Sequence, residues 1–186
     1  HGGVAYERFL SGGPIALQML LSGLSKPLPV PILIVQHISD GFVEGFVDWL
    51  ATTTHYGVQI AVAGDLPQPG LAYVAPSGRH MQLRANGMIE LVDMPTEHGV
   101  RPSVAVLFRS VAAVYGAAAV GILLTGMGRD GALELKAMRS AGALTFAQDR
   151  ESSVVFGMPG EAVGLDAASC VSSPDKIADM LGELFR

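Results

Sequence analysis

The sequence contains one cysteine, Cys170, among its 186 residues. A disulfide within this sequence is therefore excluded, and a reducing compartment such as the cytoplasm is the expected location. Charged residues make up only 16% of the chain, its net charge is −5, and it has no run of lysine or arginine. A chain with this charge distribution is not expected to bind nucleic acid.

Long uncharged stretches are also few. One of them, Ser110 to Gly128, contains Tyr115, Gly121 and Thr125, and the spacing of its apolar residues changes in the middle. We interpret it as the end of a helix, a turn and a buried strand rather than a membrane span. No basic segment is followed by an apolar one in the manner of a signal peptide, so no membrane insertion is expected.

Hydrophobic residues, by contrast, make up 49% of the chain, which is enough to form a full core. The sequence has no linker, internal repeat or low-complexity segment, and it predicts a single domain over residues 1–186. The chain begins with His1 rather than methionine, so we expect it to be a fragment of a longer protein.

Apolar runs and helix-like stretches alternate along the sequence. Continuous apolar runs at Ile32–Gln36 and 118–124 predict strands that are buried on both faces. Shorter strands are predicted at 4–9, 58–63, 71–75, 143–147 and 168–171, and helices at 14–24, Gly41–Thr53, 104–115, Gly131–Ser140 and from Pro174 onwards. The pair Asn86-Gly87, within an alternating segment, predicts a hairpin. This order predicts an α/β fold: a doubly wound, mainly parallel sheet with helices on both faces and an added antiparallel hairpin.

Three polar residues of different chemistry follow predicted strands. Ser11 follows the first strand, His37 follows Ile32–Gln36, and Asp130 follows the run 118–124. Ligands of such sheets bind at the carboxyl ends of the strands, and a hydroxyl, an imidazole and a carboxylate can form a catalytic triad. Each residue also has a structural interpretation. Ser11 can bond the backbone at a helix entry, His37 can be a satisfied structural histidine, and Asp130 can stabilise the N-terminus of the following helix.

Motifs for other ligands are missing from the sequence. The segment Ser11–Pro14 is not a phosphate-binding glycine motif, and Pro14 lacks a donor N–H, so a nucleotide-binding domain is the weakest alternative. No metal site and no cofactor are expected, because the remaining histidines are scattered without metal-ligand spacing; they include His55, His80 and His98.

Five longer segments occur in a characteristic order: PILIVQHISDGF, GLAYVAPSGRHMQL, RPSVAVLFRSVA, GILLTGMGRDGA and AQDRESSVVFGMPGEA. They resemble the catalytic domain of the chemotaxis protein-glutamate methylesterase (CheB type). The likeness extends from about Ser11 to the C-terminus. It implies a doubly wound α/β domain without a cofactor, which hydrolyses γ-glutamyl methyl esters on chemoreceptors, and in many members deamidates receptor glutamines, with a Ser-His-Asp triad.

The resemblance also implies roles for individual residues. His37 matches the histidine of the family's QH pair, and Asp130 matches the aspartate of its TGMG-x-DGA block. Gly12, Gly13 and Met127 then flank the oxyanion site. The residues that flank the substrate would be Arg101, Pro102, Ser103 and Met158.

The partners implied by the resemblance are the methylated cytoplasmic helices of a chemoreceptor and a phosphorylatable receiver domain. In the family, the receiver domain usually precedes the esterase domain and covers its site. No receiver domain is present in this sequence, so it is expected elsewhere in the full-length protein.

The likeness fails at the nucleophile. The family reads G-A-S-T-G-G-P after its first strand, and alignment on Gly12-Gly13-Pro14 puts the nucleophilic serine at Leu10. Three explanations stay open: the first residues are altered or foreign to the native chain, Ser11 acts after a one-residue shift of the turn, or this copy is inactive. The expected function is therefore a protein-glutamate methylesterase, with an inactive binding or regulatory module as the alternative.

Three milder departures lie beside the expected site. Val100 replaces a histidine of the family, Ala105 replaces an aspartate and Gly160 replaces an arginine. These differences concern substrate binding and leave the expected fold unchanged.

Overall fold

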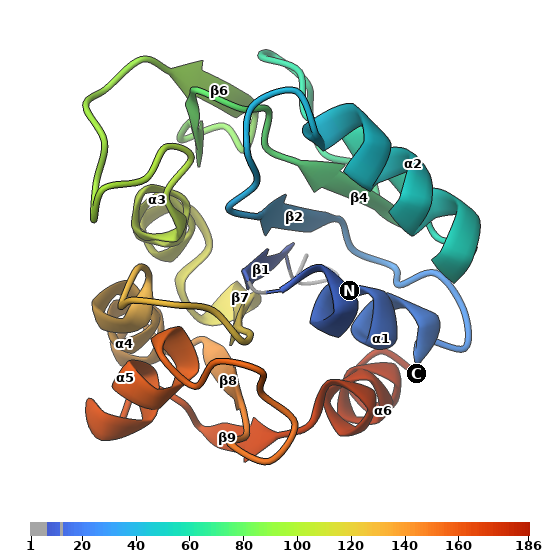
Figure 1. The fold of residues 1–186 in the computed structure, drawn as a ribbon, viewed down its shortest axis with the longest axis vertical. Coiled ribbons are helices and arrows are strands. Elements are labelled where there is room, and N and C mark those ends of the chain that lie inside the picture. The colour runs from blue at the N-terminus through green and yellow to red at the C-terminus, as the bar shows by residue number, and fades with distance from the viewer. Residues whose placement is uncertain (1–6, 12) are drawn as a thin grey trace.

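The computed structural model of the chain describes residues 13–186 and the backbone of residues 7–11. In this part of the chain, parallel pairing joins strands in the order β3-β4-β2-β1-β7-β8-β9, and β5 pairs with β6 in an antiparallel hairpin (Figure 1). The strands are β1 (Glu7–Ser11), β2 (Ile32–Val35), β3 (Gly57–Ile60), β4 (Leu71–Val74), β5 (His80–Leu83), β6 (Ile89–Val92), β7 (Ala119–Leu123), β8 (Leu144–Gln148) and β9 (Cys170–Ser172). The predicted parallel sheet with an added hairpin is confirmed.

Helices cover both faces of this sheet. Figure 1 shows α1, α2 and α6 on one side and α3, α4 and α5 on the other. They are α1 (Pro14–Ser22), α2 (Val43–Thr54), α3 (Val104–Tyr115), α4 (Ala132–Ser140), α5 (Met158–Gly164) and α6 (Pro174–Leu184), with a 3-10 turn, η1 (Gly116–Ala118), after α3. The sheet is therefore the middle of three layers, as the alternation of strands and helices predicts.

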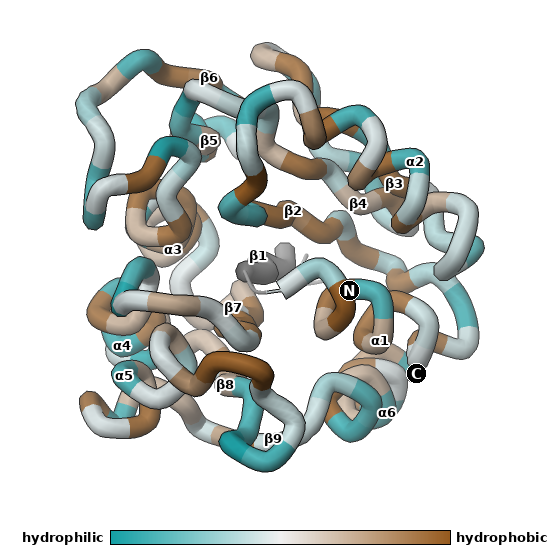
Figure 2. The backbone as a smooth tube through the Cα atoms, viewed as in Figure 1, coloured by the Kyte–Doolittle hydropathy of each residue, from teal (hydrophilic) through white to brown (hydrophobic). Residues whose placement is uncertain are grey.

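The central strands are hydrophobic because both of their faces are covered. Every residue of β2 is buried, and Figure 2 shows this strand as a hydrophobic segment in the middle of the molecule. Ile32 and Ile34 belong to the core beneath α1, α2 and α6, whereas Leu33 and Val35 belong to the core beneath α3, α4 and α5. Successive side chains of a strand point to opposite faces, so one short apolar run serves both cores.

The order of the strands fixes where a ligand can bind. From β1 the chain passes through α1 to β2 on one side, and it later returns through α3 to β7 on the other side. In such sheets the ligand crevice lies at the carboxyl ends of the strands where the direction of winding reverses. The backbone of Ser11, at the end of β1, pairs with Val35 and Leu123 at this point.

The structure differs from the prediction at two elements. Residues 4–6 of the predicted first strand lie outside the described residues, and the described part of β1 continues past Phe9 to Ser11. Helix α5 was not predicted, because a segment with Pro159 and two glycines has weak helix propensity and is stabilised by tertiary contacts. The uncharged stretch from Ser110 forms the end of α3, η1 and β7, as expected.

None of the helices that the structure describes is long and apolar enough to cross a membrane.

Candidate active site

A cleft of ≈ 500 Å³ opens at the carboxyl ends of the central strands. We call it the carboxyl-edge cleft. Its walls come from segments that are far apart in the sequence: Gly13, Gln36, His37, His98, Val100, Thr125, Gly126, Met127, Gly128 and Met158. The position agrees with the crevice that the strand order defines.

An imidazole and a carboxylate meet in this cleft. His37, just after β2, places Nε2 2.8 Å from Oδ2 of Asp130, which follows β7. The side chain of His37 is 27% exposed and that of Asp130 is 4% exposed. An ionised carboxylate only accepts hydrogen bonds, so Nε2 carries the proton and Nδ1 remains as the basic nitrogen.

Asp130 is held by the N-terminus of α3. The Ser103 hydroxyl donates to Oδ1 at 2.7 Å, the Val104 N–H donates to Oδ2 at 2.8 Å, and the Ala105 N–H donates to Oδ1 at 3.1 Å. Burial raises the pKa of Asp130, but the hydrogen bonds from His37, Ser103, Val104 and Ala105 outweigh it and hold the pKa below its ordinary value. Asp130 is therefore an anion, and it stabilises α3 rather than the following helix α4, contrary to our structural interpretation from the sequence.

Local conformation brings the carboxylate to this helix. Ser103 is the N-cap residue of α3, as the sequence predicts, and its hydroxyl also accepts from the Ala105 N–H. Gly131 follows Asp130 with φ +82°, and a Cβ atom there would lie 2.5 Å from Cγ1 of Val104. Only glycine permits both this backbone conformation and this close approach of the loop to α3.

The loop after β7 is fastened to the segment before α5. The N–H of Gly126 donates to the Val155 carbonyl at 3.1 Å, and the Gly126 carbonyl accepts from the Met158 N–H at 2.9 Å. Among the described residues, the N–H groups of Met127 and Gly128 have no hydrogen-bond partner. The loop is thus fixed on one side and leaves two donors for an anionic ligand.

The protein-family model described as CheB methylesterase matches residues 11–181 of the chain. The chain belongs to the CheB methylesterase family.

Individual relatives agree with this assignment. The chain is 54% identical over 174 residues to the protein-glutamate methylesterase/protein-glutamine glutaminase 1 of Syntrophus aciditrophicus, and 55% identical over 174 residues to its counterpart in Nitrosospira multiformis. Each match covers 94% of this chain and 50% and 49% of the two relatives, so the chain spans about half the length of the curated relatives it matches. The crystal structure of the Thermotoga maritima CheB methylesterase catalytic domain superposes with a TM-score of 0.92 at 32% identity, covering 97% of this chain and 98% of that one.

The nucleophile expected in the CheB family falls at the edge of the described residues. The backbone of Ser11 ends β1 beside β2 and β7, and neither its side chain nor that of Leu10 is described. Gly12 lies outside the described residues. Gly13 is the N-cap residue of α1 and lines the carboxyl-edge cleft.

The remaining expected residues occupy different environments. Met127 lines the cleft and is 81% exposed, whereas Met158 lines it from a buried position. Arg101 and Pro102 line an adjoining pocket of ≈ 300 Å³, which His37 also borders. Ser103, expected to flank the substrate, is instead fully buried and faces Asp130.

Two residues of the site escaped the sequence analysis. His80 is fully buried and contacts the backbone of Pro95 and Ser103 through its two ring nitrogens. Gln36 lines the cleft, and its buried Oε1 has no hydrogen-bond partner among the described residues. Both residues stand in segments that resemble the family, but no residue pattern around either of them indicates a role in the site.

One group among the described residues has metal-ligand geometry. Ligand atoms of Glu97, His98 and Glu134 lie within 4.8 Å of one another. The guanidinium of Arg109 already forms a two-pronged ion pair with Glu97, at 2.5 and 2.6 Å, and lies 3.4 Å from Glu134. Arg109 supplies the positive charge that a cation would bring.

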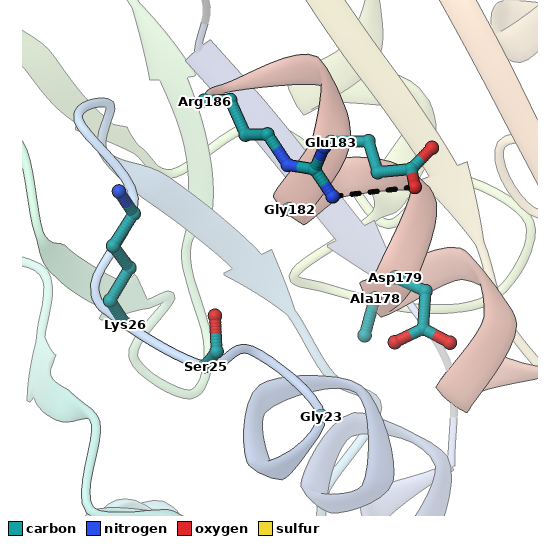
Figure 3. A pocket seen from close by; sticks show the side chains of 8 residues that line it. All are labelled: Gly23, Ser25, Lys26, Ala178, Asp179, Gly182, Glu183 and Arg186. Carbon is teal, nitrogen blue, oxygen red and sulfur yellow. Dashed lines mark ion pairs between the residues drawn. The ribbon is translucent and has the colours of Figure 1, made fainter.

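A second hollow, the α1–α6 pocket, lies at the far end of α1. Its volume is ≈ 520 Å³, and Figure 3 shows its lining of Gly23, Ser25, Lys26, Ala178, Asp179, Gly182, Glu183 and Arg186. The ion pair drawn there, Arg186 to Glu183 at 3.6 Å, joins side chains that are 79% and 70% exposed. This pocket has no pair comparable to His37 and Asp130.

Proposed function

We propose that the chain is the catalytic domain of a protein-glutamate methylesterase that also deamidates protein glutamines. The observation that carries the proposal is the 2.8 Å contact between His37 Nε2 and Asp130 Oδ2 beside the end of β1. A general base that is oriented by a buried carboxylate is what a hydroxyl nucleophile needs. Relatives that are 54% and 55% identical to this chain over 174 aligned residues are named for these two activities.

The proposed reaction begins at His37 Nδ1. This nitrogen takes the proton of the Ser11 hydroxyl while Asp130 stabilises the imidazolium. The serine oxygen attacks the carbonyl carbon of the γ-glutamyl methyl ester. The C–OCH₃ bond then breaks, and the imidazolium returns its proton to the leaving oxygen, so methanol departs and an acyl-serine remains.

Water completes the proposed cycle. His37 Nδ1 takes a proton from a water molecule, whose oxygen attacks the acyl carbon. The bond to the Ser11 oxygen breaks, the serine recovers its proton from the imidazolium, and the product leaves as a glutamate carboxylate after its remaining proton passes to solvent. With a glutamine substrate the first leaving group is ammonia, and the second half of the reaction is the same.

Backbone N–H groups are proposed to stabilise the oxyanion of both tetrahedral intermediates. The N–H of Met127 is unpaired among the described residues, and its loop is fastened to the segment before α5. We assign the second donor to Gly12 on the family resemblance. One such donor is worth about 3 kcal/mol of transition-state stabilisation in comparable enzymes.

The surroundings of the cleft suit a protein substrate. A pocket of ≈ 280 Å³ shares Gly13, Thr125 and Gly126 with the carboxyl-edge cleft. Its rim carries exposed apolar side chains: Ile15, Met19, Val154 and Val155. Because contiguous exposed apolar surface is typical of protein-binding sites, we propose the methylated cytoplasmic helices of a chemoreceptor as the substrate.

We further propose that residues 1–186 act as one catalytic domain in the cytoplasm. A phosphorylatable receiver domain would occupy another part of the full-length protein. The curated relatives are about twice as long as this chain, which leaves room for such a domain.

The alternative, an inactive binding module, rests on Leu10 alone. The relatives carry enzyme names, and the His37–Asp130 pair has the geometry that catalysis needs. We therefore propose Ser11 as the nucleophile, since it is the hydroxyl residue at the end of β1.

The test combines covalent labelling with product release. A fluorophosphonate probe phosphonylates activated serines, and peptide mass spectrometry identifies the labelled residue. We expect the label on Ser11 and no label in Ser11→Ala or His37→Ala. The unsubstituted chain should release methanol from methylated receptor membranes, and these two variants should not. Asp179→Asn, in the α1–α6 pocket, is the control that keeps full activity.

The contrary results are equally specific. Methanol release that is the same in the unsubstituted chain and in His37→Ala would contradict the triad. An unlabelled, inactive chain that gains both properties in Leu10→Ser would show that the inactive module is correct.

A further inference from the structure

A buried imidazole outside the proposed triad contacts two backbone groups of opposite kinds. His80 begins β5 and is fully buried. Its Nε2 lies 2.8 Å from the carbonyl oxygen of Pro95, and its Nδ1 lies 3.1 Å from the backbone nitrogen of Ser103. A carbonyl only accepts and an N–H only donates, so the ring carries its proton on Nε2 and accepts at Nδ1.

The two contacts lie at the ends of one wall of the active site. The chain between Pro95 and Ser103 includes His98 and Val100, which line the carboxyl-edge cleft. Arg101 and Pro102, farther along the segment, line the adjoining pocket. One buried ring therefore ties this wall to the hairpin at both ends.

The Ser103 end also supports Asp130. The Ser103 hydroxyl and the next two backbone N–H groups all donate to this carboxylate. The N–H of Ser103 itself is directed away from Asp130 and donates to His80. If that N–H lost its acceptor, a buried donor would be unpaired, and the start of α3 would shift together with the three donors.

We propose that His80 is a positioning residue for the proposed esterase reaction and acts through two separable contacts. Its contact with Ser103 holds Asp130, and through Asp130 the base His37. Its contact with Pro95 holds the wall against which the substrate lies. The expected effects on the kinetics of methanol release rest on the proposed function.

Two substitutions separate the contacts. His80→Gln places an amide nitrogen near the position of Nε2, so it keeps the donor to Pro95 and loses the acceptor for Ser103. His80→Asn places an oxygen near the position of Nδ1, so it keeps the acceptor for Ser103 and loses the donor to Pro95. The pair forms its own matched control, because both variants replace the ring with a neutral amide.

The kinetic parameters of methanol release are expected to split between the two variants. His80→Gln lowers kcat by about tenfold to a hundredfold with little change in KM, because a displaced base loses its attack geometry. His80→Asn retains kcat and raises KM by about fivefold, the worth of one hydrogen bond. A residue that only supports folding would reduce the active fraction in both variants and leave KM unchanged.

Two magnetic-resonance measurements test the proposal even if the chain has no esterase activity. We expect the proton between His37 and Asp130 to give a downfield resonance that is lost in His37→Ala. We expect it unchanged in His80→Asn and shifted in His80→Gln. In the unsubstituted chain we expect a coupling across the hydrogen bond between the Ser103 nitrogen and His80 Nδ1.

Equal kinetic behaviour of the two variants, an unshifted resonance in His80→Gln, or the lack of the coupling would each overturn the proposal. If His80→Gln does not fold, the coupling in the unsubstituted chain and the resonance in His80→Asn still give the decision. A chain that releases no methanol but shows the coupling and the shifted resonance contradicts the proposed function and leaves the positioning role intact.

Discussion

The carboxyl-edge cleft and the α1–α6 pocket have nearly the same volume, ≈ 500 and ≈ 520 Å³, and different chemistry. In the cleft, a buried carboxylate receives hydrogen bonds from four groups, and one of them is an imidazole open to the cleft. In the α1–α6 pocket, the charged side chains of Glu183 and Arg186 are mostly exposed and meet at 3.6 Å.

The difference shows that the size of a hollow does not identify an active site. Exposed charges remain solvated, so an ion pair between them contributes little free energy and fixes their orientation only weakly. Buried charges need defined partners, and these partners orient them. The sheet topology adds a second reason, since only the cleft lies where the winding of the sheet reverses.

The largest effect is expected from a matched pair of aspartate substitutions. Asp130→Asn replaces the acceptor of His37 Nε2 with a group that stabilises the imidazolium poorly, and methanol release should fall by about 10⁴-fold. Asp179→Asn in the α1–α6 pocket should leave the rate within about twofold. Similar losses in both variants would erase the distinction between the two hollows.

Glycine-to-alanine substitutions in the two regions should change the free energy of unfolding in opposite directions. A Cβ atom at Gly157 would lie 2.6 Å from the Gly126 carbonyl oxygen and 3.0 Å from the Gly128 nitrogen. Gly157→Ala should therefore destabilise the fold by about 2 kcal/mol and displace the loop that carries Met127. Gly182→Ala meets no atom within 4 Å and should stabilise α6 by up to about 1 kcal/mol. Urea unfolding of the two variants measures both effects, and equal destabilisation would contradict the close backbone crossing at Gly157.

The pH dependence of stability should reveal the buried carboxylate. Folding lowers the pKa of Asp130, so its contribution to stability is present above the ordinary value of about 3.9 and is lost as the pH falls through the lower folded value. The difference in unfolding free energy between the unsubstituted chain and Asp130→Asn, about 2 kcal/mol near neutral pH, should shrink below about pH 4. Parallel stability curves for the two proteins down to pH 3 would refute this assignment.

The smallest effect is expected from two arginines. Arg109 bonds both oxygens of Glu97 and anchors the wall of the cleft, whereas Arg186 forms the exposed pair of the α1–α6 pocket. Arg109→Lys loses the two-pronged geometry and should raise KM about threefold while costing about 1 kcal/mol or less. Arg186→Lys should change neither quantity. A KM that is unaltered in Arg109→Lys would mean that this ion pair does not hold the wall.

Much of the fold follows from local patterns. The buried runs of β2 and β7, the Asn86-Gly87 hairpin and the Ser103 cap each depend on neighbouring residues, and the sequence predicts them correctly. Helix α5 depends instead on the crossing of Gly126 and Gly157, which are far apart in the sequence. No local propensity reports such a contact.

The site likewise has residues whose placement the sequence predicts and residues whose placement it does not. His37 and Asp130 follow predicted strands, so their convergence at one edge could be predicted from the topology. The helix that holds Asp130 could not, because the N-terminus of α3 precedes Asp130 by more than twenty residues and is brought to it by the packing against Gly131. His80 is hidden for the same reason: its partners Pro95 and Ser103 are defined by how the long loop returns to the hairpin.

The orientation of the His37 ring has a practical result for inhibitor design. Its Nε2 is sealed against a buried carboxylate, so an alkylating haloketone that enters the cleft should attach to Nδ1. In chymotrypsin-like proteases the carboxylate faces Nδ1, and Nε2 is the nitrogen left to react. A warhead shaped for the opposite side of the imidazole would therefore discriminate this domain from those proteases in a cell extract.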